Sequence, residues 1–267
     1  MLVLVLMLLE ASICFALKIE KMATFHAIQM DDPLDKMSGP SAHDDLFRSA
    51  TVAQSQLQVR LGFIRKVYGI LTAQLLLTTI TAGVFMYTES IKDFVQQSPG
   101  LLMVGMIMSL ILVIALMVKR REAPTNFYLL AAFTLCEAYT IGTVVTFFDQ
   151  FVVLQAFMLT VGTTMALTVY TFQSKKDFSN WGAGLFNILW IFILAGFMQI
   201  LMPSDILYLG MAVAGAIIFS CFIVFDTHLL LHKLSPEEYI VAAINLYLDI
   251  INLFLEILKI LDAMKKN

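Results

Sequence analysis

Acidic and amide side chains recur on one face of the last apolar stretch of the chain. The segment AAINLYLDIINLFLEILKIL carries four of them, at spacings of 4, 3 and 4 residues: Asn245, Asp249, Asn252 and Glu256. In a helix this spacing places all four on one face, while Leu, Ile and Phe cover the remainder. A polar seam of this kind is typical either of a structural hydrogen-bond network or of a pathway for ions or protons. Because two of the four side chains are carboxylic acids, we favour the pathway.

A further acidic residue, Asp226, comes at the end of the preceding apolar span, in the stretch FIVFDTHLLLHKL. Hydropathy places Asp226 at the membrane edge, so a solvated carboxylate in the headgroup region is one interpretation. The other is that Asp226 meets Asp249 across neighbouring helices. Two close carboxyls in a low dielectric cannot both ionise cheaply and would share a proton. Such a pair can sense pH, and when doubly ionised it offers hard oxygen ligands for Ca²⁺.

Other ionisable residues lie in or beside apolar stretches. Glu137, within FTLCEAYTIG, either bonds to a hydroxyl or amide on another helix or belongs to the same polar interior. The basic run at residues 119–121 mainly marks topology, although one of its members could reach back as a counter-ion to Asp226. His228 and His232 could join Asp226 around zinc, but solvated interfacial histidines are far commoner.

The elements that must position these residues are seven apolar stretches near the length that crosses a hydrocarbon core roughly 30 Å thick. Of the 267 residues, 60% are hydrophobic and only 14% are charged, which is far from the composition of a soluble domain. The expected spans are Val67–Tyr87, Leu101–Val118, Asn126–Phe148, Val152–Phe172, Trp181–Met202, Ile206–Phe225 and Tyr239–Leu261. We therefore predict an all-α, polytopic membrane bundle of seven transmembrane helices, with short linkers that make consecutive helices antiparallel neighbours.

The amino-terminal part differs from this membrane domain, so we divide the chain into residues 1–58 and 59–267. The leader MLVLVLMLLEASICFA resembles a secretory signal but has no basic residue before its apolar run. It is an upstream extension, with Met22 as an alternative start, or a signal or anchor, or an interfacial helix. Residues 22–58 are polar without sustained periodicity, and we expect a mobile cytosolic tail.

Lysine and arginine are distributed unequally between the two sides of the predicted bundle. Nine of them lie on one side: Arg60, Arg65, Lys66, Lys119, Arg120, Arg121, Lys175, Lys176 and Lys233. The opposite linkers hold only Lys92. The positive-inside rule therefore predicts a cytosolic amino terminus. We expect a buried seventh helix and leave open whether its lysine-bearing tail lies on the opposite side or returns.

Composition also excludes some functions. The net charge of −3 argues against nucleic acid as a partner, because binding to phosphates requires clustered Lys and Arg. The three cysteines all lie in apolar stretches, which is not the pattern of a disulfide framework.

Four stretches carry a family resemblance: VRLGFIRKVYGILTAQLLLTT, LTVYTFQSKKDFS, FDTHLLLHKLSPEEY and INLYLDIINLFLEIL. They resemble the transmembrane BAX inhibitor motif, or lifeguard, family. The resemblance covers the chain from Val59 to Lys266, and LSPEEY followed by LYLDIINLF is its most specific part. The apolar leader departs from the cytosolic tail of the family.

The resemblance implies a bundle that surrounds a central last helix. It implies a pH-sensitive Ca²⁺ leak from the Golgi or endoplasmic reticulum and protection against apoptosis, with Ca²⁺ as transported ion and no cofactor. The implied partners are the bilayer, Ca²⁺, protons, and apoptotic regulators or Ca²⁺-release channels. Asp226 and Asp249 resemble the di-aspartyl sensor of the family and are the candidate Ca²⁺ ligands.

The resemblance also implies a basic latch, for which Lys119 and Arg120 are the candidates because the alignment is ambiguous by one position. A lysine would give a point charge instead of a bidentate fork. Glu237, in SPEEY, resembles another acidic position linked to ion passage.

Two alternatives come from other functional classes. One is a non-conducting membrane scaffold that binds apoptotic regulators or Ca²⁺ channels. The other is a membrane-embedded hydrolase, which we do not favour. An intramembrane aspartyl protease would carry a GxGD motif, whereas Asp249 follows LYL. A zinc hydrolase would need about three histidines and an aspartate, and only His228 and His232 lie near a span.

Overall fold

The structure, a computed structural model, describes residues 6–13, 16 and 42–266, with the backbone alone for residues 42–56. All regular secondary structure in this part of the chain is helical. The alternative start at Met22 and residues 22–41 of the predicted tail lie outside the described residues.

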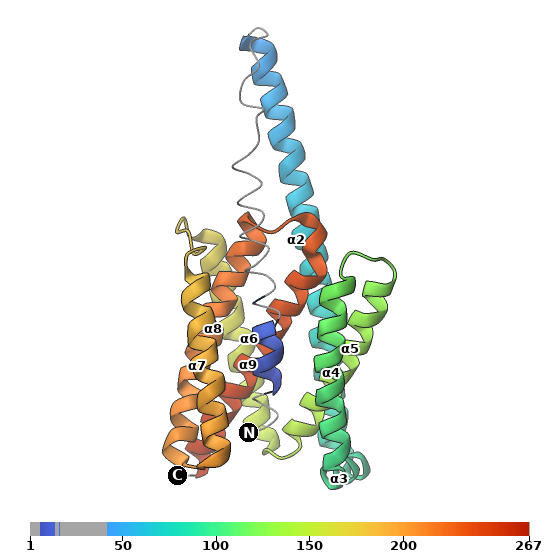
Figure 1. The fold of residues 1–267 in the computed structure, drawn as a ribbon, viewed down its shortest axis with the longest axis vertical. Coiled ribbons are helices and arrows are strands. Elements are labelled where there is room, and N and C mark those ends of the chain that lie inside the picture. Colours follow the sequence, from blue (N-terminus) through green and yellow to red (C-terminus); the bar gives the residue numbers. More distant parts are fainter. Residues whose placement is uncertain (1–5, 14–15, 17–41, 267) are drawn as a thin grey trace.

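The helices follow one another with short linkers (Figure 1). Their bounds are Ala42–Tyr87 (α2), Glu89–Gln97 (α3), Pro99–Lys119 (α4), Thr125–Val145 (α5), Gln150–Gln173 (α6), Trp181–Leu201 (α7), Asp205–His232 (α8) and Tyr239–Lys266 (α9), with a 3₁₀ turn at Pro236–Glu238. Seven of them are long and apolar enough to span a membrane, namely α2 from Leu57 onward and α4 to α9. The predicted polytopic bundle of seven spans is therefore confirmed.

The long helix α2 corrects the prediction of a mobile tail, because it already begins at Ala42. Residues 42–58, which we expected to be irregular, belong to its first turns. Pro40 is the last proline before this helix, and no glycine occurs between residues 42 and 58. Once the apolar span has nucleated a helix, such a segment extends it at little cost.

The leader also contains a helix, residues 6–13, which we call the leader helix. An interfacial helix would leave one face in the headgroup region. Instead, Met7, Leu8 and Glu10 are each at most 1% exposed. The helix lies inside the bundle, between α4 and the pair α8 and α9 (Figure 1), which contradicts the interfacial interpretation.

Helix α9 is the central element of the bundle, as the family resemblance implied. It packs on α8, α6 and α2, and its residues from Ile240 to Glu256 are all buried. A span that lipid surrounded on one side would expose a stripe of side chains. The protein itself therefore provides almost the whole environment of the polar seam.

The carboxyl tail lies at the opposite end of the bundle from the linker that precedes α9 (Figure 1). Lys265 forms an ion pair of 2.9 Å with Asp149, in the linker between α5 and α6. We call this end of the bundle the tail face. The linkers α4–α5, α6–α7 and α8–α9 lie at the other end, which we call the linker face. Helix α9 therefore runs from one end of the bundle to the other.

Helices α8 and α9 approach each other closely at Gly215. A Cβ atom at this position would lie 2.7 Å from Cδ of Glu256 and 2.7 Å from Cζ of Phe192. Real Cβ atoms do not approach other carbon atoms so closely, and both neighbours are buried. The small residue therefore allows α8 to cover the acidic side chain of Glu256, as small residues do between membrane helices.

We predict that Gly215→Ala destabilises the protein by about 1–3 kcal/mol, because the added methyl group overpacks a dry helix contact. The measurement is the thermal unfolding of purified protein in detergent. The matched control is Gly210→Ala on the same helix, where a Cβ meets nothing within 4 Å. The control should unfold at the same or a higher temperature, because alanine favours the helix. Equal unfolding temperatures for the two variants would contradict the close approach.

Candidate functional site

A small cavity lies within the bundle where α8 and α9 face each other. Its polar lining consists of Asp226, Asn245 and Asp249. Five apolar residues complete it: Ala11, Leu189, Phe219, Phe222 and Leu248. The free volume is about 10 Å³, close to the room that one water molecule needs. The cavity is too small for a hydrated cation in this conformation.

The two aspartates of the predicted sensor come together at this cavity. Asp226 and Asp249 are 3% and 5% exposed. Burial of Asp226 contradicts the interpretation as a solvated carboxylate. Helix α8 continues for six residues beyond Asp226, to His232, and Thr227 to Leu230 are also buried. Two carboxyls in such a setting can hold a proton between them or, when ionised, coordinate a cation.

The remaining members of the α9 seam divide into two groups. Asn245 lies in the cavity with Asp249. Asn252 and Glu256 lie further along, both fully buried, and find partners on their own helix. The Asn252 amide donates to the Leu248 carbonyl at 2.8 Å, and Glu256 forms an ion pair with Lys259 one turn later. This part of the seam fits the structural interpretation, and only the first part faces the cavity.

Glu137 is fully buried on α5 and lies away from the aspartates, beside the leader helix. Its neighbour there is Glu10, whose Oε1 accepts a hydrogen bond of 2.5 Å from the Ser109 hydroxyl on α4. Sequence reasoning missed Glu10. The signal was present, because Glu10 is the single charged residue in an apolar run of 16 residues. The rule that singled out Glu137 applies to it equally.

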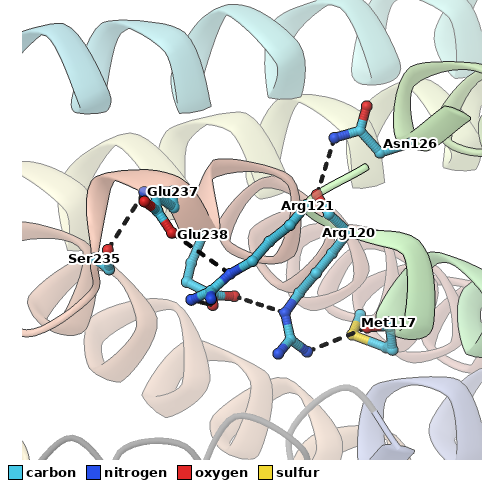
Figure 2. A network of polar contacts seen from close by, with 7 residues as sticks. All are labelled: Met117, Arg120, Arg121, Asn126, Ser235, Glu237 and Glu238. Carbon is cyan, nitrogen blue, oxygen red and sulfur yellow. Dashed lines mark hydrogen bonds and ion pairs between the residues drawn. The ribbon is translucent and has the colours of Figure 1, made fainter. Parts of the chain in front are cut away.

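Two arginines after α4 hold the α8–α9 linker (Figure 2). Arg120 Nε lies 3.2 Å from Glu238 Oε2, and Arg121 Nη2 donates to Glu238 Oε1 at 3.0 Å. Asn126 fixes the loop by donating to the Arg120 carbonyl at 2.9 Å. Glu237 is exposed and lies 3.6 Å from Arg121. Two ion pairs thus tie the α4–α5 linker to the α8–α9 linker. The pair of Arg120 and Glu238 is nearly buried, and the pair of Arg121 and Glu238 is half-buried.

The structure gives both latch candidates an acidic partner. Lys119 pairs with Glu122 on the exposed surface at 2.8 Å, and Arg120 pairs with Glu238. The Arg120 pair joins the α4–α5 linker to the residue that directly precedes α9. Sequence could not assign the partner, because Glu238 and Asp226 lie on the same side of the bundle.

Two further contacts hold the end of α8 that bears Asp226. The Arg60 guanidinium on α2 donates to the carbonyls of Leu231 at 2.8 Å and Leu234 at 2.5 Å, which caps the carboxyl end of α8. His228 Nε2 lies 3.0 Å from Asp177 Oδ1 in the α6–α7 linker. Hydrogen bonds from Ser179, and then from His228, hold the pKa of Asp177 below its ordinary value.

The zinc hypothesis involved His228 and His232, whose ring centroids lie 4.7 Å apart. Within the residues that the structure describes, no group of three or more histidine, cysteine, aspartate or glutamate side chains is placed to hold a metal. His228 instead ties the α6–α7 linker to α8.

Seven membrane-spanning helices, of which the central one bears acidic side chains, define a class of polytopic membrane proteins with a buried polar interior. Residues 60–267 match the family described as "Inhibitor of apoptosis-promoting Bax1". The chain therefore belongs to this family of anti-apoptotic membrane proteins, and the resemblance drawn from four sequence stretches is confirmed.

Individual relatives cover most of the chain. It is 50% identical to the Golgi anti-apoptotic protein of Vaccinia virus (strain Lister), over 85% of this chain and 95% of the relative. It is 49% identical to Protein lifeguard 4 of Mus musculus over the same shares. It is 37% identical to Bax inhibitor 1 of Schizosaccharomyces pombe, over 92% of this chain and 98% of the relative.

We predict that Glu238→Gln destabilises the folded protein by about 1–3 kcal/mol, because it leaves the nearly buried Arg120 without a charged partner. The neighbouring variant Glu237→Gln is the matched control, since its side chain is 69% exposed. An exposed pair contributes roughly 0–1 kcal/mol. Chemical unfolding of both variants in detergent measures the difference. A control that loses as much stability as Glu238→Gln would refute the assigned latch.

Proposed function

We propose that this protein is a pH-sensitive Ca²⁺ leak channel of the Golgi or endoplasmic reticulum membrane, and that it inhibits apoptosis by limiting the Ca²⁺ held in that store. One observation carries the proposal: Asp226 and Asp249 line the same buried cavity, on adjacent helices. The names of the relatives support the cellular part, because they include a Golgi anti-apoptotic protein and a Bax inhibitor.

The proposed gate is a competition between protons and Ca²⁺ for the same carboxyl oxygens. With a proton shared between Asp226 and Asp249, the pair carries one charge and α8 can remain packed on α9. When both carboxyls are ionised, they repel each other and offer oxygen ligands to a divalent cation. A proton or ion that binds one packing of α8 and α9 better than another shifts the balance between them.

Passage of an ion requires that the interior open, because the cavity holds about one water molecule in this conformation. The contacts of the linker face oppose this movement. Arg60 caps α8, Asp177 binds His228, and Arg120 with Arg121 binds Glu238. All three lie within about three turns of the aspartates along α8 or α9. In our proposal they set how readily α8 and α9 separate.

We propose that the linker face is cytosolic. It carries the nine basic residues counted in the sequence, whereas the tail face carries Lys92 and the lysines at the end of α9. A full crossing of α9 then places the carboxyl tail on the luminal side. There Lys265 and Lys266 pair with Asp149 and Asp262, so these lysines fasten the tail and do not serve as a cytosolic address.

A second candidate function is a non-conducting scaffold that binds apoptotic regulators or Ca²⁺-release channels. The observation in its favour is the small size of the cavity, which offers no room for a hydrated ion beside the aspartates. Purified protein in vesicles made only of lipid separates the two proposals, because a scaffold moves no Ca²⁺ without its partners.

We predict that Asp249→Asn abolishes the pH dependence of Ca²⁺ efflux from such vesicles between about pH 5 and 8. Asparagine has nearly the same shape as aspartate but cannot bind or release the proton. The measurement is the rate of Ca²⁺ release, reported by an indicator outside the vesicles, across the pH range.

Asp262→Asn is the matched control, because Asp262 lies on the same helix and pairs with Lys266 at 2.6 Å outside the cavity. Its pH profile should follow that of the unaltered protein. A pH profile that survives Asp249→Asn would remove the gate, and vesicles that release no Ca²⁺ with any variant would favour the scaffold.

We predict that the two ends of α7 label on opposite sides of a sealed organelle membrane. Asn180→Cys precedes α7 on the linker face and Ser204→Cys follows it on the tail face. Both are placed in a chain whose own cysteines are replaced by serine. A membrane-impermeant maleimide added to sealed microsomes should label position 180 at once, and position 204 only after detergent. The reverse order would show that the amino terminus is luminal.

A further inference from the structure

The leader helix occupies a defined seat inside the bundle. It lies outside residues 60–267, which carry the family match, so it is an addition to the shared membrane domain. Leu8 is completely buried and Met7 is 1% exposed. The described part of the leader helix therefore lies within the protein.

The seat joins two parts of the bundle. Helix α4 packs on α5, and α5 packs on α2, whereas α6, α7, α8 and α9 form the other part, which α2 also contacts through α9. The leader helix lies between them (Figure 1). On one side Glu10 accepts a hydrogen bond from Ser109 of α4 and lies beside Glu137 of α5. On the other side Ala11 forms part of the wall of the cavity that holds Asp226 and Asp249.

A buried carboxyl is costly without a hydrogen-bond partner, so Glu10 prefers this seat to lipid. The apolar residues around it gain by burial, but they would gain similarly in lipid. The hydrogen bond between Ser109 and Glu10 therefore makes this position specific, and the apolar residues pack around it. If the leader were anchored only in the lipid, nothing would place Glu10, its one charged residue, in contact with Ser109.

We propose that residues 6–13 are an intramolecular plug that closes the bundle interior over the Asp226–Asp249 cavity. A chain that begins at Met22 lacks the plug, and its cavity opens to water. The effect on Ca²⁺ release rests on the function proposed above, whereas the seat and the closure of the cavity do not. The tests below separate the two.

The seat is tested by crosslinking in membranes. In a chain whose native cysteines are replaced by serine, Ala11→Cys is combined with Asn245→Cys, which lines the same cavity, and treated with a short bis-maleimide. This pair leaves the contact between Glu10 and Ser109 intact, and we expect an internal crosslink. Ala11→Cys with Asn180→Cys, which lies on the linker face, is the matched pair and should not crosslink. No crosslink at position 245, or equal crosslinking of both pairs, would overturn the plug.

Closure is tested by the labelling of Asn245→Cys with a small polar thiol reagent. A closed site that opens for at most about a tenth of the time labels about tenfold faster once it stays open. We expect this increase in the chain that begins at Met22 and in Leu8→Asp, which places a charge in the fully buried position. Ala16→Asp alters an exposed residue of the leader and should leave the labelling rate unchanged.

Ca²⁺ release from vesicles then tests the consequence. We expect faster release from the chain that begins at Met22 and from Leu8→Asp than from the full chain and Ala16→Asp. Equal, measurable release from all four proteins would overturn the plug as a regulator. If none of the four proteins releases Ca²⁺, the proposed leak function fails. The labelling of position 245 then tests closure by itself, and an unchanged labelling rate in the chain that begins at Met22 would overturn closure.

Discussion

The cost of holding acidic side chains in a low-dielectric interior is the constraint on which this structure depends. A charge at the bilayer centre costs about 2.5–3.5 kcal/mol even on insertion scales. The protein meets this cost by placing α9 in the centre, where residues Ile240 to Glu256 are all buried by other helices. Gly215 allows α8 to close over Glu256, and Lys259 supplies the counter-charge. Each acid of the seam thus has a protein environment in place of lipid.

The two ends of the bundle differ in how they are held. On the linker face, arginines from α2 and from the α4–α5 linker bind the ends of α8 and α9. On the tail face, the described contacts include the exposed pair of Lys265 and Asp149, which contributes little to stability. The nearly buried pair of Arg120 and Glu238 is the stronger tie. Asp226 lies on the side of the stronger ties, six residues before the end of α8 that Arg60 caps.

The sequence predicted the spans and the seam well, because both follow from periodicity. Apolar runs of about 20 residues determine where helices cross, and the spacing of Asn245, Asp249, Asn252 and Glu256 determines that they share a face. Partners were harder to predict. Arg120 was a candidate counter-ion for Asp226 but pairs with Glu238. A sequence pattern predicts the helix face and the membrane side of a residue, but not its neighbour on another helix. Asp226 looked interfacial because a charged residue at the end of an apolar run is also what marks the end of a membrane span in a sequence.

The leader presents the same physics as the seam, in a segment that periodicity could not place. A short apolar segment with one carboxyl would be equally stable as part of a signal, in an interface or in a core, if apolar burial alone decided. Its polar contacts decide instead, because Ser109 and Glu137 lie inside the bundle and Glu10 can reach them only from there. The interior therefore holds two acidic sites, Glu10 beside Glu137 and the cavity lined by Asp226 and Asp249. The leader helix takes part in both, because Ala11 lies in the wall of the cavity one residue after Glu10.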